Sequence, residues 1–362
     1  MSTALITQQL PFETAASLSP AVRASVSVII PCYNEERFIG QALENLADQY
    51  ACEDYELIVV DGMSDDRTRE VVEEFQDSHP NLSVKLLNNP ARNIPHALNL
   101  GIAAARGEII ARMDAHAAPS PGYVRRCVAV LSESDAAVVG MPCRVRPGAD
   151  GVVARSIAMA VSHPFGIGDA KYRLGSQDDG RATQEDVDTV AFACFRKSVW
   201  LELGGFDEQL LTNEDYDFNY RVRASGARVV LDRSAHCDYF ARSTFGKLAA
   251  QYFRYGTWKA RMLKQRPQST KLRQLVAPLF VLSLVVLSAL GFWRNAFWAL
   301  LAIELCVYLF AGFGFALAAT RRAGEGMSVV FAMAIAFFTI HFSWGSSFFW
   351  GLITSPGVCR QK

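Results

Sequence analysis

Between Val26 and Asp232, short apolar runs rich in β-branched residues alternate with longer amphipathic stretches. The short runs are typical of buried parallel strands, and the longer stretches are typical of the helices that connect them. The pattern predicts strands at 26–30, 57–60, 84–87, 109–113, 137–140, 190–195 and 228–231, and helices at 35–49, 69–77, 95–106, 121–132, 197–203 and 214–224. Residues 25–240 are therefore expected to form an α/β domain with a mostly parallel sheet.

Residues 155–188 interrupt this alternation. They contain Gly166, Gly168, Gly175 and Gly180 and the polar run SQDDGRATQED. Such a composition favours a loop, and long loops in compact domains often serve an active site. We expect a mobile active-site loop, with an idle surface excursion as the alternative.

The apolar pattern changes after residue 274. Leu275–Trp293 carries no charge, Ala296–Thr320 carries only Glu304, and Met327–Thr354 carries only His341 as a titratable group. A helix needs about 20 apolar residues to cross a bilayer. Residues 275–362 are therefore expected to be a membrane domain with spans at 275–293, 296–320 and 327–354. A buried helical bundle is the alternative, which stretches this long and this poor in charge disfavour.

Basic residues orient these spans. The positive-inside rule places the side before the first span, with the α/β domain, in the cytoplasm, because six basic residues precede that span. They are Lys259, Arg261, Lys264, Arg266, Lys271 and Arg273. Arg360 and Lys362 would then fall outside, against the rule. A re-entrant third segment bending at Gly345 and Gly351 is the alternative, so the side of the C-terminus stays open.

Residues 241–274 mix aromatic and basic side chains, as a helix resting on a membrane surface does. We expect interfacial amphipathic helices here. Within them, the ring of Tyr255 and the guanidinium of Arg254 are suited to bind a ligand, and simple membrane anchoring is the alternative.

Composition narrows the possible partners. The 36 Lys and Arg residues equal the 36 Asp and Glu residues in number, which argues against a general nucleic-acid binder. The eight cysteines include no Cys-x-x-Cys pair, so a reduced compartment is expected rather than a structural zinc site. Residues 1–24 lack the features of a signal peptide and are expected to be a flexible segment, leaving the α/β domain in the cytosol.

Polar residues follow three of the predicted strands, where parallel α/β sheets bind ligands. VSVIIPCYNEE (26–36) and YELIVVDGMSDDRT (55–68) end two strands, and Asp61 is placed to bond a base or a ribose. Asp65 and Asp66 fit helix capping better. EIIARMDAH (108–116) ends the third strand with Asp114 and His116, which could share a divalent ion or leave the histidine paired with a carboxylate.

Acidic residues also open a predicted helix in TNEDYDFNYRVR (212–223). Glu214, Asp215 and Asp217 suit the positive end of a helix dipole, and a carboxylate there is also suited to act as a general base. His236, after the strand ARVVLD (227–232), is either a third metal ligand or a structural residue.

Together these motifs resemble the family 2 glycosyltransferases of GT-A fold over residues 26–260. The resemblance implies that a nucleotide binds at four strand-end residues, Pro31, Tyr33, Glu35 and Asp61. Asp114 contacts the diphosphate through Mn²⁺ or Mg²⁺, with His116 in place of the family's second Asp and His236 as a candidate ligand. Asp215 matches the general base of an inverting transfer, with Asp217 as the fallback.

Further details resemble one branch of that family, the succinoglycan-type exopolysaccharide glucosyltransferases. These details are FGIGDAKYR (165–173), VDTVAFACFRKSVW (187–200) and QYFRYG (251–256). The last is similar to the Gln-x-x-Arg-Trp of processive members, which implies an acceptor site that includes Glu214, Gln251, Arg254 and Tyr255.

The branch implies a membrane-anchored hexosyltransferase at the cytoplasmic face of a bacterial inner membrane. It would move a sugar, glucose, from a UDP-sugar to a polyprenyl-diphosphate-linked saccharide. The alternatives are transfer to a polyprenyl monophosphate, processive polysaccharide synthesis and, most distantly, a non-catalytic membrane scaffold.

Overall fold

The computed structural model describes residues 25–50, 54–174 and 183–354. The expected flexible segment 1–24 lies outside the described residues. The first half contains β1 (Val26–Cys32), α1 (Ile39–Ala47), β2 (Tyr55–Asp61), α2 (Thr68–Ser78), β3 (Ser83–Asn88), α3 (Ile94–Ala104), β4 (Ile109–Arg112), β5 (Ala118–Pro119), α4 (Tyr123–Glu133), β6 (Ala136–Gly140), β7 (Cys143–Arg146), α5 (Val152–Ala160) and α6 (Pro164–Ile167). The second half contains a 3₁₀ turn (Lys171–Arg173), β8 (Gln184–Asp186), β9 (Cys194–Arg196), α7 (Lys197–Glu202), α8 (Glu214–Ala224), β10 (Arg228–Asp232), β11 (Cys237–Phe240), α9 (Phe245–Gln265), a second 3₁₀ turn (Pro267–Ser269), α10 (Leu272–Gly291), α11 (Ala296–Arg322) and α12 (Met327–Thr354).

An eight-stranded sheet in the order β3-β2-β1-β4-β9-β6-β10-β8 forms the centre of the α/β domain. The pairs β1–β2, β1–β4, β2–β3 and β6–β10 are parallel, whereas β9 runs antiparallel between β4 and β6. Every residue of β2 is buried, and apolar side chains pack against both faces of the sheet. The expected mostly parallel α/β architecture is confirmed.

The parallel register brings the strand-end motifs to one edge. Cys32 at the end of β1 pairs with Asp61 at the end of β2, and Ile29 of β1 pairs with Arg112 at the end of β4. The segments that follow β1, β2 and β4 therefore emerge side by side, because parallel strands point their carboxyl ends the same way.

The prediction of a loop over 155–188 is wrong for its first part. Residues 152–160 form α5, which packs against α12, and Ser156 Oγ donates to the carbonyl of Val329 over 3.2 Å. A Cβ added at Gly166 in α6 would lie 2.2 Å from the Ala160 carbonyl oxygen and 3.3 Å from the Phe337 ring. Local glycine content could not reveal these contacts, since the partner helix lies about 170 residues further along the chain. The polar run at 175–182 lies outside the described residues.

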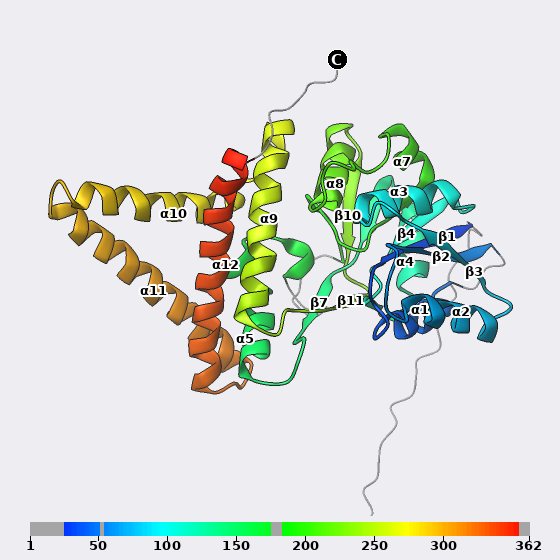
Figure 1. Ribbon diagram of the computed structural model, residues 1–362, viewed down its shortest axis with the longest axis horizontal. Coiled ribbons are helices and arrows are strands. Elements are labelled where there is room, and N and C mark those ends of the chain that lie inside the picture. Colours follow the sequence, from blue (N-terminus) through cyan, green and yellow to red (C-terminus); the bar gives the residue numbers. More distant parts are fainter. Residues whose placement is uncertain (1–24, 51–53, 175–182, 355–362) are drawn as a thin grey trace, which may run out of the picture.

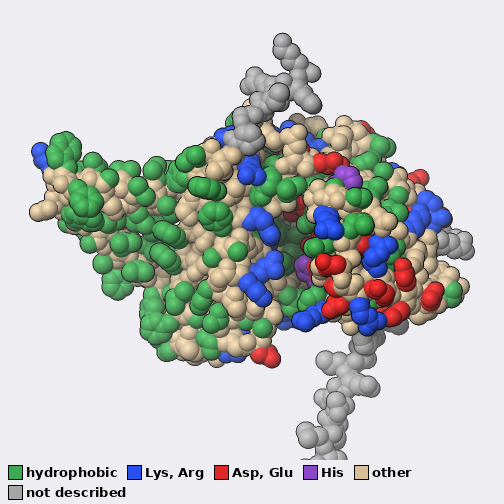
Figure 2. Space-filling model, in the orientation of Figure 1, with side chains coloured by type: hydrophobic (Ala, Val, Ile, Leu, Met, Phe, Trp, Pro, Cys, Tyr) green, Lys and Arg blue, Asp and Glu red, His purple; other side chains and the backbone are tan. Residues whose placement is uncertain are grey.

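Three helices, α10, α11 and α12, are long and apolar enough to cross a membrane. In Figure 1, α10 and α11 project away from the α/β domain, whereas α12 runs beside α9. Figure 2 shows hydrophobic side chains covering the projecting arm and charged ones gathered over the α/β domain. That α9 and its neighbours rest on a membrane surface stays a prediction.

Small residues let α9 and α12 approach closely. A Cβ added at Gly256 of α9 would lie 2.2 Å from Ser347 Oγ and 2.5 Å from the Trp344 carbonyl. A Cβ at Gly351 of α12 would in turn lie 2.5 Å from the Thr257 carbonyl. Backbone atoms cannot move aside as a flexible side chain can, so glycine is required at this contact.

We expect Gly256→Ala to destabilise the protein by about 1–3 kcal/mol, because an added methyl group overpacks a close contact. Gly246→Ala, in the first turn of the same helix, meets nothing within 4 Å and serves as the control. Thermal unfolding in detergent measures both. A midpoint for Gly256→Ala equal to that of Gly246→Ala would contradict the packing described here.

Candidate active site

A cavity of about 860 Å³ lies between the α/β domain and helices α9–α12. Figure 2 shows the molecule hollowed between these two parts. Seven of the predicted site residues line the cavity: Asp114, His116, Glu214, Asp215, Gln251, Arg254 and Tyr255. Pro31, Tyr33, Glu35, Asp61 and His236 are not among its lining residues.

Asp215 enters the cavity at the start of α8. The preceding Asn213 has a left-handed backbone with φ 69°, which turns the chain sharply into the helix. Asp215 Oδ1 accepts a hydrogen bond from the Tyr216 backbone N–H over 2.7 Å. Asp217, in contrast, is fully buried and forms ion pairs with Arg221 and Arg266. The fallback Asp217 is thus engaged inside the protein, and Asp215 is the one that borders the cavity.

Arg112 is a site residue that the motif analysis did not single out. It is buried at the end of β4, and its Nη2 lies 2.9 Å from Glu214 Oε1 and 3.5 Å from Asp114 Oδ1. It therefore joins the end of β4 to the start of α8. The sequence could have pointed to Arg112, because it interrupts the apolar run EIIARM and a buried charge needs a partner.

Burial dominates the electrostatics of Glu214. It raises the pKa of this carboxyl to about 7, although the nearby Arg112 cation acts in the opposite direction. Its predicted role in acceptor binding is untested, and its visible contact is with Arg112.

The predicted nucleotide residues lie just outside the cavity. Glu35 reaches towards it, with its Oε1 3.1 Å from His116 Nδ1, and this contact is the main reason that the pKa of His116 is raised. The Tyr33 ring is exposed beneath the Arg92 guanidinium, 5.9 Å from its centroid. Pro31 is the next-to-last residue of β1.

Asp61 is occupied by the protein itself. Its carboxylate is fully buried and accepts hydrogen bonds from Ser64 Oγ over 2.5 Å and from Arg69 Nη1 over 2.8 Å. In this structure Asp61 therefore holds the loop after β2, and the expected contact with a base or ribose stays a prediction. Asp66 Oδ1 accepts from the Thr68 backbone N–H at the start of α2, although the N-cap residue is Arg67. Asp65 Oδ1 accepts from Asn34 Nδ2 instead.

Asp114 and His116 present a carboxylate and an imidazole to the cavity, a donor set that suits Mn²⁺. His116 contacts Glu35 through Nδ1, which leaves Nε2 for a ligand. Over the described ranges, no group of three or more His, Cys, Asp or Glu could hold a metal. The pair thus fits a metal whose remaining ligands come from substrate.

His236 is not brought to this pair. Its Nε2 lies 3.8 Å from Asp238 Oδ1, and burial lowers its pKa.

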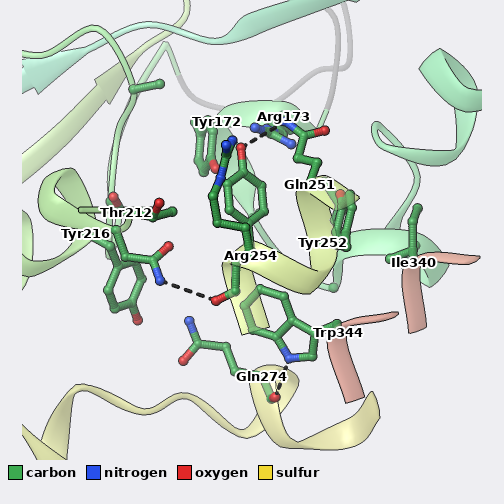
Figure 3. A pocket seen from close by; sticks show the side chains of 18 of the residues that line it. Tyr172, Arg173, Thr212, Tyr216, Gln251, Tyr252, Arg254, Gln274, Ile340 and Trp344 are labelled. Atoms are coloured by element: carbon green, nitrogen blue, oxygen red, sulfur yellow. Dashed lines mark hydrogen bonds between the residues drawn. The ribbon is translucent and has the colours of Figure 1, made fainter. Parts of the chain in front are cut away.

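The opposite wall of the cavity is basic and aromatic. Figure 3 shows Tyr172, Arg173, Gln251 and Arg254 gathered at one end. Gln251 Nε2 donates to Tyr239 Oη over 2.9 Å and to Tyr255 Oη over 3.0 Å, which fixes these side chains.

Arg173 is a second site residue without an assigned role in the sequence. Its guanidinium lies 4.9 Å from the Tyr239 ring centroid and 5.4 Å from that of Tyr172, and its buried Nε has no hydrogen-bond partner. Over the part of the chain that the structure describes, it forms no ion pair with a carboxylate. The sequence could have pointed to Arg173, because it ends FGIGDAKYR (165–173), one of the segments that resemble the succinoglycan-type branch.

The cavity ends among the apolar helices. Phe280, Tyr308, Ile340 and Trp344 line this part. His341 holds it together: its Nδ1 lies 2.9 Å from Tyr308 Oη and its Nε2 lies 2.7 Å from the Phe165 carbonyl. The lining of one cavity therefore combines carboxylates, cations such as Arg173 that form no ion pair within the described ranges, and apolar side chains of α10–α12.

Comparison with known proteins identifies the class. Residues 27–202 match the family model described as Glycosyl transferase family 2. The chain is 27% identical over 327 residues to succinoglycan biosynthesis protein ExoA of Rhizobium meliloti, covering 89% of this chain and 93% of that protein. It is 26% identical over 245 residues to a dolichyl N-acetyl-α-D-glucosaminyl phosphate 3-β-D-2,3-diacetamido-2,3-dideoxy-β-D-glucuronosyltransferase of Methanococcus voltae, covering 66% and 74%.

The fold has a solved counterpart. The mannosyltransferase PcManGT from Pyrobaculum calidifontis, in complex with GDP-Man and Mn²⁺, aligns with a TM-score of 0.62 and 22% identity, covering 91% of this chain and 90% of that one. Residues 27–202 thus form a glycosyl transferase family 2 domain of GT-A fold, and the chain is a glycosyltransferase. Inversion at the anomeric carbon is typical of this family.

The raised pKa of Glu214 predicts a pH-dependent stability. An unfolded glutamate titrates near pH ~4.3, whereas the folded Glu214 carboxyl titrates at about 7. Between these values the folded protein holds a proton that the unfolded chain has released, so stability falls as pH rises. We expect the thermal midpoint of the wild type to fall relative to that of Glu214→Gln across this window, measured by differential scanning fluorimetry in detergent. Parallel curves for the two proteins would contradict the raised pKa.

Proposed function

We propose that this protein is a membrane-anchored inverting hexosyltransferase of exopolysaccharide biosynthesis. It transfers a sugar, glucose, from a UDP-sugar to a polyprenyl-diphosphate-linked saccharide at the cytoplasmic face of a bacterial inner membrane. One observation carries the proposal: a single cavity joins Asp114 and His116, the Asp215 carboxylate and an apolar end among α10–α12. The names of ExoA and of the Methanococcus voltae relative, which specify exopolysaccharide synthesis and a lipid-linked saccharide, support it.

The donor binds at the strand-end edge of the sheet. Asp114 and His116 would hold Mn²⁺ or Mg²⁺, which supplies positive charge to the departing nucleoside diphosphate. The exposed Tyr33 ring is available to stack on the base. Arg112 acts as a positioning residue, since it contacts both Asp114 and Glu214.

The acceptor hydroxyl lies next to Asp215. Asp215 accepts the hydroxyl proton while the acceptor oxygen forms a bond to the anomeric carbon from the face opposite the diphosphate. The bond from that carbon to the diphosphate oxygen breaks, and UDP leaves with its electron pair. One carboxylate is sufficient for this single displacement.

The lipid-borne part of the acceptor follows the cavity towards the membrane helices. Arg173 and Arg254 both line the cavity, and neither forms an ion pair within the described ranges. A diphosphate supplies the missing anion, and Tyr172 and Tyr255 supply faces on which sugars stack. The same cations would also suit a polyprenyl monophosphate, which is the second candidate acceptor.

The first test is nucleotide release by the detergent-purified protein, with UDP- and GDP-sugars, Mn²⁺ or Mg²⁺, and bacterial lipid extract. We expect lipid-dependent release from one UDP-sugar, lost on chelation of the metal. Asp215→Asn should lower the rate by roughly 100-fold or more, because it removes the general base. Asp77→Asn on the exposed face of α2 is the matched control and should leave the rate unchanged.

The outcome separates the candidate functions. A small effect of Asp215→Asn would favour the monophosphate acceptor, whose nucleophile is already ionised. Long products from a single donor would favour a processive synthase. UDP binding without turnover on any lipid would favour the scaffold.

The second test concerns Arg173. Arg173→Gln removes a cation from the acceptor path, and a charge-assisted hydrogen bond contributes about 1.5–3 kcal/mol. We expect the KM for the lipid acceptor to rise by about tenfold or more, since ~1.4 kcal/mol corresponds to a factor of ten, while the KM for the nucleotide sugar stays unchanged. Arg125→Gln on the exposed face of α4 is the control. A change in the KM for the donor alone would assign Arg173 to the donor site instead.

A further inference from the structure

α10 crosses α12 instead of running along it. The first half of α10 meets the middle of α12, where a Cβ at Gly345 would lie 2.5 Å from the Ala277 carbonyl and 2.6 Å from a Val281 methyl. Trp344 Nε1 also donates to the Gln274 carbonyl over 3.0 Å. The second half of α10 is exposed, at Val285 for example, and Figure 1 shows it leading away from α12. Two helices that cross in this way cannot both follow the bilayer normal.

α12, in contrast, accompanies α9 along its length. Ser347 and Gly351 contact Gly256 and Thr257, and Lys264 Nζ donates to the Leu352 carbonyl over 2.5 Å. Because α9 and α12 pack side by side, both must have the same orientation relative to a membrane and lie at similar depths. α9 carries Lys247, Arg254, Lys259, Arg261 and Lys264 and forms a wall of the active-site cavity.

A bilayer-spanning α12 would therefore carry α9 and the adjoining α/β domain to the depth of the hydrocarbon core. A single Lys or Arg at that depth costs about 2.5–3.5 kcal/mol on the insertion scale. α9 alone brings four cationic residues besides the buried Lys259: Lys247, Arg254, Arg261 and Lys264. The charge distribution thus excludes α12 as the helix that follows the bilayer normal.

α10 has the properties of a span. Its first half crosses α12, and its second half, which projects beyond α12, carries no charged residue up to Arg294. Beyond its end, the exposed Phe292 and Trp293 precede Arg294, a sequence typical of a membrane–water interface. α11, with 27 residues, returns at a slant in Figure 1 and ends in Arg321 and Arg322.

The outer face of α12 suits the membrane surface. Phe331, Ile335, Phe338 and Phe342 are exposed on one stripe, and Phe331 and Phe338 lie beside rings of α11, so the stripe faces the side from which the hairpin projects. The opposite face of α12 packs against α9, so it need not be polar as it would be in a free interfacial helix. An apolar stripe backed by charged structure binds at the headgroup–acyl boundary.

We infer that the α10–α11 hairpin is the membrane-crossing unit, with two spans, and that α12 lies along the membrane surface between the bilayer and α9. Both ends of α12 then stand on the side of the catalytic domain. This replaces the three-span prediction. The inference goes beyond the proposed function and does not depend on the substrate.

The test is the labelling of single cysteines by a membrane-impermeant maleimide in spheroplasts and in inside-out vesicles. The parent is the full chain with Cys52, Cys306 and Cys359 replaced by serine; Cys32, Cys127, Cys143, Cys194 and Cys237 are buried. Four exposed positions are compared, through Asp77→Cys, Arg294→Cys, Ser328→Cys and Thr354→Cys. They report the catalytic domain, the hairpin tip and the two ends of α12.

We expect Arg294→Cys to react in spheroplasts, and the other three variants to react in inside-out vesicles only. Ser328→Cys is the matched control for Thr354→Cys, because three spans would separate these two ends of one helix. Reaction of Thr354→Cys in spheroplasts would overturn the inference. Protection of Arg294→Cys in spheroplasts, or of both α12 ends in both preparations, would overturn it too.

Discussion

The packing of α9 between α12 and the α/β domain is the constraint on which the rest of the structure depends. On one side, glycines and small hydroxyl residues bring its backbone against α12. On the other side, Gln251 binds Tyr239 and Lys259 is buried, with its Nζ 3.2 Å from the Ser269 carbonyl and 4.1 Å from the Tyr216 ring centroid. Burial lowers the pKa of Lys259 to about 7. α9 therefore contacts α12 on one side and, on the other, Tyr216, the residue that follows Asp215 in α8.

Buried charge organises the chemistry of the cavity. Arg112 lies between Asp114 and Glu214, and Asp217 lies between Arg221 and Arg266. Breaking a buried pair leaves an uncompensated charge, which is strongly unfavourable, so these contacts fix the relative positions of β4, α8 and the segment after α9. Because Asp217 is neutralised in this way, the first turn of α8 presents Asp215 to the cavity.

The lining of the cavity matches a substrate pair of mixed character. In the proposed function, the carboxylate and imidazole groups meet the nucleoside diphosphate, and the cations that form no ion pair within the described residues meet the lipid-borne acceptor. Aromatic and aliphatic side chains from the apolar helices complete the path. Under the proposed function, a water-soluble donor and a lipid-borne acceptor would both reach Asp215 through this cavity.

The sequence by itself determined the elements whose signals are local. Strand and helix periodicity located β1, β2, β4 and α8. The parallel register then explains why Asp61 after β2, and Asp114 and His116 after β4, lie at the same edge of the sheet, on either side of β1. The three apolar helices were equally evident, since length and lack of charge depend on no partner. The resemblance to family 2 glycosyltransferases rested on these same motifs.

Only the tertiary structure decided which residues share a cavity and which are withdrawn from it. It buried Asp217 in ion pairs, closed Asp61 against Ser64 and Arg69, left His236 outside the cavity, and added Arg112 and Arg173. It also turned 152–160 into a helix against α12 and set α12 beside α9. Each of these outcomes depends on contacts between segments far apart in the chain, because burial and pairing are set by neighbours in space, which periodicity along the sequence does not specify.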